Sequence, residues 1–414
     1  MSNDNKSDSK ISCWSHIDKY PDDPIIEINI DFDQDPFPQK VNLSNSSYKD
    51  ENGKPYILKC IKKSLEKYAK DNNLNHEYLP MGGDAEFCQN AIKVAYKSDF
   101  KYLNRLATIQ CLSGTDSLKI GQRFLSQFYP FKKKIFFSSP TWGNHYAIAE
   151  IANLEIGHYR YYNPKTKGID FEGLMEDLQK MENNSIILFH ACAHNPTGAD
   201  LNHEQWEKVL KIVIEKKFLP FFDMAYQGFA TGDLEEDAFA LRLFANTGIN
   251  MILAQSFSQN LGLFGERIGC LSILTQNEKE KIAVQTNLEN LLNTEYSNPP
   301  KFNAAIVNIV LSDEQLKKEW LEEVHMMGTR VKEMRLALKQ KLEEVGSKIN
   351  WDSIVKQKGI FAYIDLGPEQ CDRLKSEFHI YTIGTGRICI PGLNPSNVEY
   401  VANAIHEVTK NRNQ

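Results

Sequence analysis

Short apolar runs alternate with segments of helical periodicity through the middle of the chain, and this alternation is the feature that most constrains the fold. The runs occupy residues 107–112, 134–137, 185–190, 218–222 and 249–253. Strands that alternate with helices in this way predict an α/β protein with a mostly parallel sheet and helices on both faces. The chain has 414 residues, which is enough for a large core and for two domains.

Polar and aromatic side chains follow these strands, at the edge where parallel sheets bind ligands. Asp223 closes an apolar strand, and a carboxylate buried there needs a cationic partner. Trp142 follows the strand at 134–137, where its indole can either stack on a flat heterocycle or pack in the core. Residues 113–118 turn another strand into a helix, and this start is either a phosphate cradle or an ordinary cap. Together these residues indicate a ligand site.

The segment 254–269 carries two hydroxyls and a guanidinium just after a strand. Ser256 and Ser258 alternate with a phenylalanine, so their hydroxyls can face the same way, and Arg267 follows nearby. Such a set suits a phosphate, because arginine is always charged and binds phosphate through two nitrogens. These residues alone still favour an ordinary polar junction. Arg387 lies on another short strand, where a buried guanidinium needs either a ligand anion or a structural salt bridge.

Several motifs, in their order along the chain, resemble those of aspartate aminotransferases. They are Asn-Pro-Thr-Gly at 195–198, Ser-Phe-Ser at 256–258, Glu-Arg-Ile-Gly at 266–269 and Ser-Asn-Pro-Pro at 297–300. The resemblance covers residues 17–410 and implies the fold type I architecture of pyridoxal-phosphate-dependent transferases. It implies a large cofactor-binding domain, residues 50–327, and a smaller α/β domain formed by residues 13–49 and 328–414. It also implies a homodimer with active sites at the subunit interface.

The resemblance implies pyridoxal 5'-phosphate as cofactor and an amino acid or 2-oxo acid as substrate. In the family, the aspartate that matches Asp223 pairs with the protonated ring nitrogen, which makes the ring an electron sink; His145 and His190 are placed to support it. The implied cofactor-binding residues are Ser113, Gly114, Thr115, Trp142, Asn195, Asp223, Tyr226, Ser256, Ser258, Arg267 and, from the other subunit, Tyr78. The implied substrate-binding residues are Arg387, for the α-carboxylate, with Asn195, Asn293 and Ser46. Gln259, Tyr226 and Trp142 occupy catalytic positions.

Four features depart from the family pattern. Gln259 occupies the position of the lysine that holds the cofactor as a Schiff base and moves the Cα proton of the substrate. A glutamine amide is neither a nucleophile nor a useful base, because its nitrogen lone pair is delocalised into the carbonyl. Asn293 replaces the arginine that binds a distal carboxylate, and Asp116 brings a negative charge to the phosphate cradle. Residues 44–47 replace a flexible, glycine-containing lid.

Three hypotheses follow from the resemblance and its departures. The first is an aspartate/2-oxoglutarate aminotransferase in which Gln259 is an engineered change. The second is a natural homologue that binds pyridoxal or pyridoxamine phosphate, or a carboxylate, without turnover. The third is a subunit that pairs with an active relative. Several departures around the reacting centre favour the second hypothesis, a pseudoenzyme in which any bound cofactor is held non-covalently.

Composition excludes other classes of function. A net charge of −6 and a pI near 6.0 argue against nucleic acid or an anionic membrane as a partner, and no apolar run approaches the ~18 residues that span a bilayer. The eight cysteines have no pairing rhythm and indicate reduced thiols in a cytoplasmic protein without a metal site. Residues 1–12 are expected to be a disordered tail without a secretory or mitochondrial presequence, and residues 20–24 an extended segment.

Overall fold

The computed structural model describes residues 12–19, 23–364 and 366–410, and in these residues the largest sheet has seven strands in the order β2-β10-β9-β8-β7-β3-β4. The strands are β2 (Leu106–Cys111), β3 (Lys134–Ser139), β4 (Glu155–Arg160), β7 (Ile186–His190), β8 (Leu219–Met224), β9 (Met251–Ser256) and β10 (Gly269–Leu274). Within this sheet β10 runs antiparallel to both of its neighbours, and the other adjacent pairs are parallel. The predicted α/β class with a mostly parallel sheet is confirmed.

Both faces of the sheet are covered by helices, because its strands are apolar on both sides. In β7, Ile187 and Phe189 belong to the core on one face, whereas Ile186 and Leu188 belong to the core on the other. The first core is closed by α3 (Ala85–Tyr96), α6 (Phe171–Lys180), α7 (His203–Glu215) and α9 (Phe239–Ala245), and the second by α4 (Gly114–Phe128), α5 (Asn144–Ile151) and α10 (Glu278–Tyr296). Such two-sided burial explains the continuous apolar runs in the sequence.

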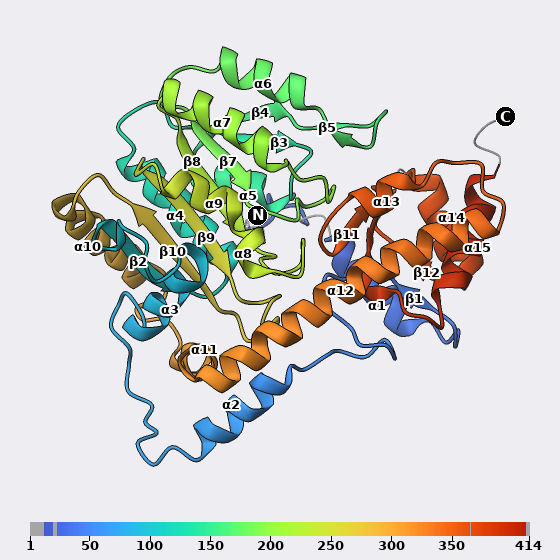
Figure 1. The fold of residues 1–414 in the computed structure, drawn as a ribbon, viewed down its shortest axis with the longest axis horizontal. Helices are drawn as coiled ribbons and strands as arrows, with labels where there is room; N and C mark the ends of the chain where they lie inside the picture. Colours follow the sequence, from blue (N-terminus) through green and yellow to red (C-terminus); the bar gives the residue numbers. More distant parts are fainter. Residues whose placement is uncertain (1–11, 20–22, 365, 411–414) are drawn as a thin grey trace, which may run out of the picture.

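A second, smaller lobe lies at the far end of α12 (Glu314–Glu344), which runs across the molecule from one lobe to the other (Figure 1). Its strands are β1 (Val41–Asn42), paired parallel with β12 (Ile380–Tyr381), and β11 (Phe361–Tyr363), paired antiparallel with β13 (Arg387–Cys389). Its helices are α1 (Pro24–Gln34), α13 (Asp352–Lys356), α14 (Pro368–Phe378) and α15 (Val398–Thr409). The N-terminal and C-terminal segments therefore share one lobe, because β1 pairs with β12.

The remaining elements connect these parts. They are α2 (Lys59–Ala69), the short helix η1 (Leu103–Arg105), the hairpin β5 (Tyr162–Asn163) and β6 (Gly168–Ile169), α8 (Leu234–Asp237), α11 (Lys301–Ser312) and η2 (Ile390–Gly392). None of the helices in the described part of the chain is long and apolar enough to cross a membrane.

The N-terminal segment corrects one prediction. An extended conformation was expected for residues 20–24, but Pro24 begins α1, and the Asp23 carboxylate accepts hydrogen bonds from the backbone N–H groups of Ile25 and Ile26. Proline is favourable at the first position of a helix, because its missing N–H would have no intrahelical partner there. Residues 20–22, and residues 1–11 of the predicted tail, lie outside the described residues.

The buried side chain of Arg335 on α12 joins the helix to the loop between α13 and β11. Its guanidinium donates to the carbonyl oxygens of Ile354 at 2.8 Å and of Gly359 at 2.7 Å, and also to that of Phe361. No carboxylate within the described residues lies within salt-bridge distance of it. One buried cation thus satisfies several loop carbonyls that would otherwise be buried without a donor.

Replacing Arg335 by methionine should destabilise the protein by about 3 kcal/mol or more, because the loop carbonyls lose their donors. The control is Arg373→Met, which removes an exposed arginine paired with Glu377 and should leave the unfolding midpoint close to that of the wild type. Urea unfolding followed by circular dichroism measures both variants. Equal midpoints for the two would contradict the structural role given to Arg335.

Candidate active site

A pocket of about 230 Å³ lies at the carboxyl ends of the central strands and gathers most of the predicted site residues. Its wall includes Ser46, Gly114, Thr115, Trp142, Asn195, Asp223, Tyr226, Ser256, Ser258, Gln259, Arg267 and Arg387. These residues come from both lobes, with Ser46 and Arg387 supplied by the smaller one. The edge of the sheet therefore brings together side chains that are up to about 340 positions apart in sequence.

One end of the pocket is suited to a phosphate. Arg267 Nη1 lies 3.4 Å from Ser258 Oγ, and Ser256 Oγ accepts a hydrogen bond from the backbone N–H of Ser258 at 3.2 Å. The first turn of α4 begins beside these groups at Gly114, where a Cβ atom would lie only 2.9 Å from Ser256 Cβ. A guanidinium, two hydroxyls and a helix N-terminus form an anion site. Ser113 caps α4 through a hydrogen bond to the backbone N–H of residue 116, and it does not line the pocket.

Asp116 does not line this pocket, although it lies in the first turn of α4. Its Oδ2 accepts hydrogen bonds from the backbone N–H of Leu112 at 2.9 Å and from the phenol of Tyr296 at 3.0 Å. Burial raises the pKa of the Asp116 carboxyl group. Both effects lessen the repulsion of a bound phosphate that the sequence suggested.

Asp223 is held by a chain of hydrogen bonds with a definite direction. Burial lowers the pKa of His190 to about 3, so this imidazole is neutral. Its Nδ1 accepts from the backbone N–H of Asn195 at 3.4 Å, and its Nε2 therefore donates to Thr141 Oγ1 at 3.0 Å. Thr141 then donates to His145 Nδ1 at 2.8 Å, and His145 Nε2 donates to Asp223 Oδ2 at 3.1 Å. These hydrogen bonds fix the position of the Asp223 carboxyl group, which lines the pocket. His190 acts through Thr141, rather than directly as expected.

The other end of the pocket holds the buried guanidinium of Arg387. Nη2 donates to the carbonyl oxygen of Ser44 at 3.0 Å, Nη1 lies 3.4 Å from Asn195 Oδ1, and the group stacks 4.2 Å from the ring centre of Phe361. Its Nε has no acceptor, and no carboxylate of the described residues pairs with it. Arg387 therefore forms no structural salt bridge with the described residues. Its buried guanidinium is left without a counter-charge and suits the carboxylate of a ligand.

Gln259 lines the pocket and is only 9% exposed, and its side-chain oxygen has no hydrogen-bond donor. No lysine and no histidine line this pocket among the described residues. Burial raises the pKa of the nearby Tyr226 phenol well above its usual value, so that phenol stays protonated. The pocket therefore offers two cations and one carboxylate for binding, but no lysine amine for covalent attachment and neither an amine nor an imidazole for proton transfer.

Two predicted residues are not brought to this pocket within one chain. Tyr78 is 87% exposed, and Asn293 is exposed on α10; neither lines the pocket. Conversely, Ile25 of α1 and Phe361 of β11 line the pocket and were missed. Nothing local marks them, because both reach the site only through the packing of the smaller lobe.

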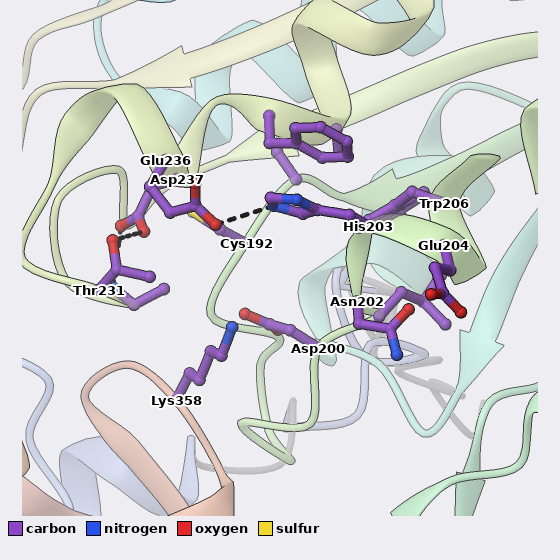
Figure 2. Close-up of a pocket in the computed structure, with 15 residues that line it drawn as sticks. Cys192, Asp200, Asn202, His203, Glu204, Trp206, Thr231, Glu236, Asp237 and Lys358 are labelled. Carbon is purple, nitrogen blue, oxygen red and sulfur yellow. Dashed lines mark hydrogen bonds and ion pairs between the residues drawn. The ribbon is translucent and has the colours of Figure 1, made fainter.

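A separate cavity of about 410 Å³ lies beside the start of α7 (Figure 2). The carboxylate of Asp200 accepts hydrogen bonds from the backbone N–H groups of residues 193 and 194, at 2.7 and 2.9 Å. The carboxylate of Asp237 accepts hydrogen bonds from those of residues 228 and 230, at 2.7 and 2.9 Å. His203 Nε2 lies 2.8 Å from Glu236, and Lys358 points toward Asp200. The two carboxylates of this cavity thus stabilise the turns that follow β7 and β8, next to the pocket of Gln259.

Comparison with known proteins places this geometry in a family. The family model "Aminotransferase class I and II" matches residues 38–405. Mitochondrial aspartate aminotransferase of Xenopus tropicalis is 44% identical over 401 residues, covering 96% of this chain and 94% of that protein. The protein of the same name from Arabidopsis thaliana is 43% identical over 404 residues, covering 97% of this chain and 93% of that protein.

Solved structures agree with the sequence relatives. Cytoplasmic aspartate aminotransferase of Saccharomyces cerevisiae superposes with a TM-score of 0.93 at 38% identity, covering 96% of this chain and 98% of that chain. An aromatic-amino-acid aminotransferase from Burkholderia pseudomallei, covalently bound to pyridoxal phosphate, also superposes with a TM-score of 0.93, at 39% identity, covering 96% of this chain and 100% of that chain. The family uses pyridoxal phosphate, and the predicted fold type I architecture is confirmed.

The predicted cytoplasmic location is wrong on these comparisons. The curated relatives from Xenopus tropicalis, Arabidopsis thaliana and Gallus gallus are all named mitochondrial. The prediction depended on the composition of residues 1–12 and on the cysteine pattern, and the names of these relatives contradict it. The matches over nearly the whole length establish ancestry: the chain belongs to the class I and II aminotransferases and, within them, to the aspartate aminotransferase family.

Proposed function

We propose that this protein binds pyridoxal or pyridoxamine phosphate without a covalent bond, together with the carboxylate of an amino acid or 2-oxo acid, and that its transamination is weak or absent. The observation that carries the proposal is Gln259, which lines a pocket whose other polar groups remain suited to the cofactor. The amide cannot attack an aldehyde or accept a proton from carbon. Binding and turnover are thus separated at one position.

The residues of the pocket fit the cofactor. Arg267, with Ser256 and Ser258, would hold the phosphate, and Asp223 would pair with the ring nitrogen. When bound, the cofactor supplies an electron-withdrawing ring that stabilises negative charge on an attached carbon. The indole of Trp142 would cover the ring, and the remaining residues would orient it: Asn195 and Tyr226 toward the phenolic oxygen.

Orientation of the second ligand follows from Arg387. Its guanidinium is held in place by Ser44 and Phe361, and it has a free Nε, so a carboxylate meets a preorganised donor. The loop at 44–47 is tied down as well, since Asn42 Oδ1 accepts the backbone N–H and the hydroxyl of Ser44 at 2.9 and 2.8 Å. A loop held in this way supports binding to a preformed site. The proposed ligand needs only one carboxylate, because the amide of Asn293 does not neutralise a second, distal carboxylate.

Gln259→Lys should convert the non-covalent site into a covalent one, because the pocket already fits the cofactor. The purified variant, incubated with pyridoxal phosphate and then borohydride, should carry a reduced adduct on residue 259 that is found by peptide mass spectrometry. The wild-type protein and Gln259→Met should bind the cofactor saturably and carry no adduct in this pocket. A Gln259→Lys protein without an adduct would refute the proposed cofactor site.

Arg387→Gln should weaken carboxylate binding by roughly 10- to 100-fold, since hydrogen bonds to charged groups contribute about 1.5–3 kcal/mol. Calorimetric titration of the cofactor-loaded protein with 2-oxoglutarate measures this change. Arg373→Gln is the matched control, because that arginine is exposed and paired with Glu377 outside the pocket. If both variants bind 2-oxoglutarate like the wild type, Arg387 is not the carboxylate site.

A homodimer with active sites at the subunit interface belongs to this proposal, as do a large domain at residues 50–327 and a small domain at 13–49 with 328–414. The exposure of Tyr78 supports the dimer, since a phenol 87% exposed beside the 42% exposed Met81 suits a covered surface. Sedimentation equilibrium at micromolar concentration should give the mass of two 47.4 kDa chains. A mass of one chain would favour instead a subunit that needs a different partner.

A further inference from the structure

A second polar cavity, of about 760 Å³, lies in the smaller lobe, outside the pocket of Gln259. Residues 38–53 form one wall and residues 392–403 the other, and Phe32 of α1 and Tyr400 of α15 also line it. A cavity of this size is within the range that small organic ligands occupy. None of its lining residues takes part in the proposed cofactor or carboxylate sites.

The two walls of this cavity are held together by specific contacts. The buried guanidinium of Arg330 on α12 donates to the carbonyl oxygens of Lys49 at 2.8 Å, Asp50 at 3.2 Å and Leu393 at 2.8 Å. At Gly392 the walls approach so closely that a Cβ atom would lie 2.5 Å from the backbone oxygen of residue 42. The cavity is therefore a defined part of the fold.

Asn394 presents an oriented donor to this cavity. Its Oδ1 accepts hydrogen bonds from the backbone N–H and the hydroxyl of Ser396, at 2.9 and 2.6 Å, and from the backbone N–H of Asn397 at 3.0 Å. These three donors fix which end of the amide is oxygen. Asn394 is only 6% exposed, and its Nδ2, which donates no hydrogen bond to the described residues, lies 3.7 Å from where a Cβ on Gly53 would sit. A ligand oxygen would satisfy this group.

Lys49 supplies a cation on the same wall. Its side chain is partly buried, its Nζ lies 5.8 Å from the ring centre of Phe32, and no carboxylate of the described residues lies within salt-bridge distance of it. Burial lowers its pKa, and the charge of Asp33 opposes that effect. The other ionic groups at the cavity are already engaged: Lys40 Nζ donates to the carbonyl oxygen of Asp35 at 2.7 Å, and Glu399 lies 3.4 Å from a lysine of α12.

We propose that this cavity binds a small organic phosphate monoester, with its phosphate on Lys49 Nζ and Asn394 Nδ2 and its organic part along Phe32 and Tyr400. A compact ammonium with three rotatable donors, together with an amide donor, suits a tetrahedral oxyanion, whereas a planar carboxylate is best matched by a guanidinium. The two half-buried aromatic rings provide apolar surface for the rest of the molecule. This site is independent of the cofactor site.

Protection of Lys49 from acetylation tests the site directly, with phenyl phosphate as the probe. Mass spectrometry reports the labelling rate of each lysine, and since no lysine lines the pocket of Gln259, binding of the probe there leaves Lys49 labelled. Lys49 should label about tenfold more slowly when phenyl phosphate is present at ten times its Kd. Lys54, an exposed neighbour outside the cavity, should label at the same rate with and without the probe.

Two further measurements sharpen the result. Asn394→Asp keeps the acceptor oxygen for Ser396 and Asn397 but replaces the free donor by a negative charge, so it should abolish protection while the protein stays folded. Benzoate, which carries a carboxylate on the same ring, should protect Lys49 much less than phenyl phosphate. If Lys49 of the wild type is not protected, the proposed site is wrong. Equal protection by benzoate would contradict the preference for phosphate. Full protection in Asn394→Asp would contradict the role of the Asn394 amide.

Discussion

A buried carboxylate at the carboxyl end of β8 is the constraint on which the site depends. Asp223 is buried, and a carboxylate where water is largely excluded is costly unless donors and a cation surround it. His145 supplies one donor, and Thr141 and His190 hold that imidazole in the tautomer that donates. These residues come from the segments that end β3, β7 and β8, so the geometry of the carboxylate requires those three strands to lie side by side in one register.

The electrostatic composition of the pocket separates binding from chemistry. Arg267 and Arg387 both line the pocket and can hold a ligand with two anionic groups, and Asp223 lines the same pocket. Transfer of a proton from carbon additionally needs a base whose pKa is near neutral, and Gln259 supplies none. Under the proposed function, each binding contact is made by a residue other than the one at position 259.

Two buried arginines on α12 attach segments of the smaller lobe to that helix through hydrogen bonds. Arg330 binds carbonyl oxygens of residues 49, 50 and 393, and Arg335 binds those of residues 354, 359 and 361. Both side chains lie on one helix, α12, whose apolar residues pack in a further core together with those of α11 and α15. Segments far apart in sequence are therefore attached to the same helix. The position of Arg387, and therefore of the candidate carboxylate site, follows from this attachment.

The sequence by itself determined the class of fold, and the candidate site residues followed from its resemblance to a family. Continuous apolar runs separated by helical segments predict a parallel sheet covered on both faces. The ends of those strands indicated a ligand site near Asp223 and Trp142, and the resemblance to the family then singled out Asn195 as well. These features are local, and local spacing is what a sequence displays.

Only the tertiary structure decided how those parts meet. It placed Ile25 and Phe361 in the pocket, made His190 act through Thr141, and turned the carboxylate of Asp116 to Leu112 and Tyr296. The same packing created the cavity of Lys49 and Asn394. Each of these contacts joins residues whose separation along the chain carries no periodic signal, so their neighbourhood depends on the folded arrangement of both lobes.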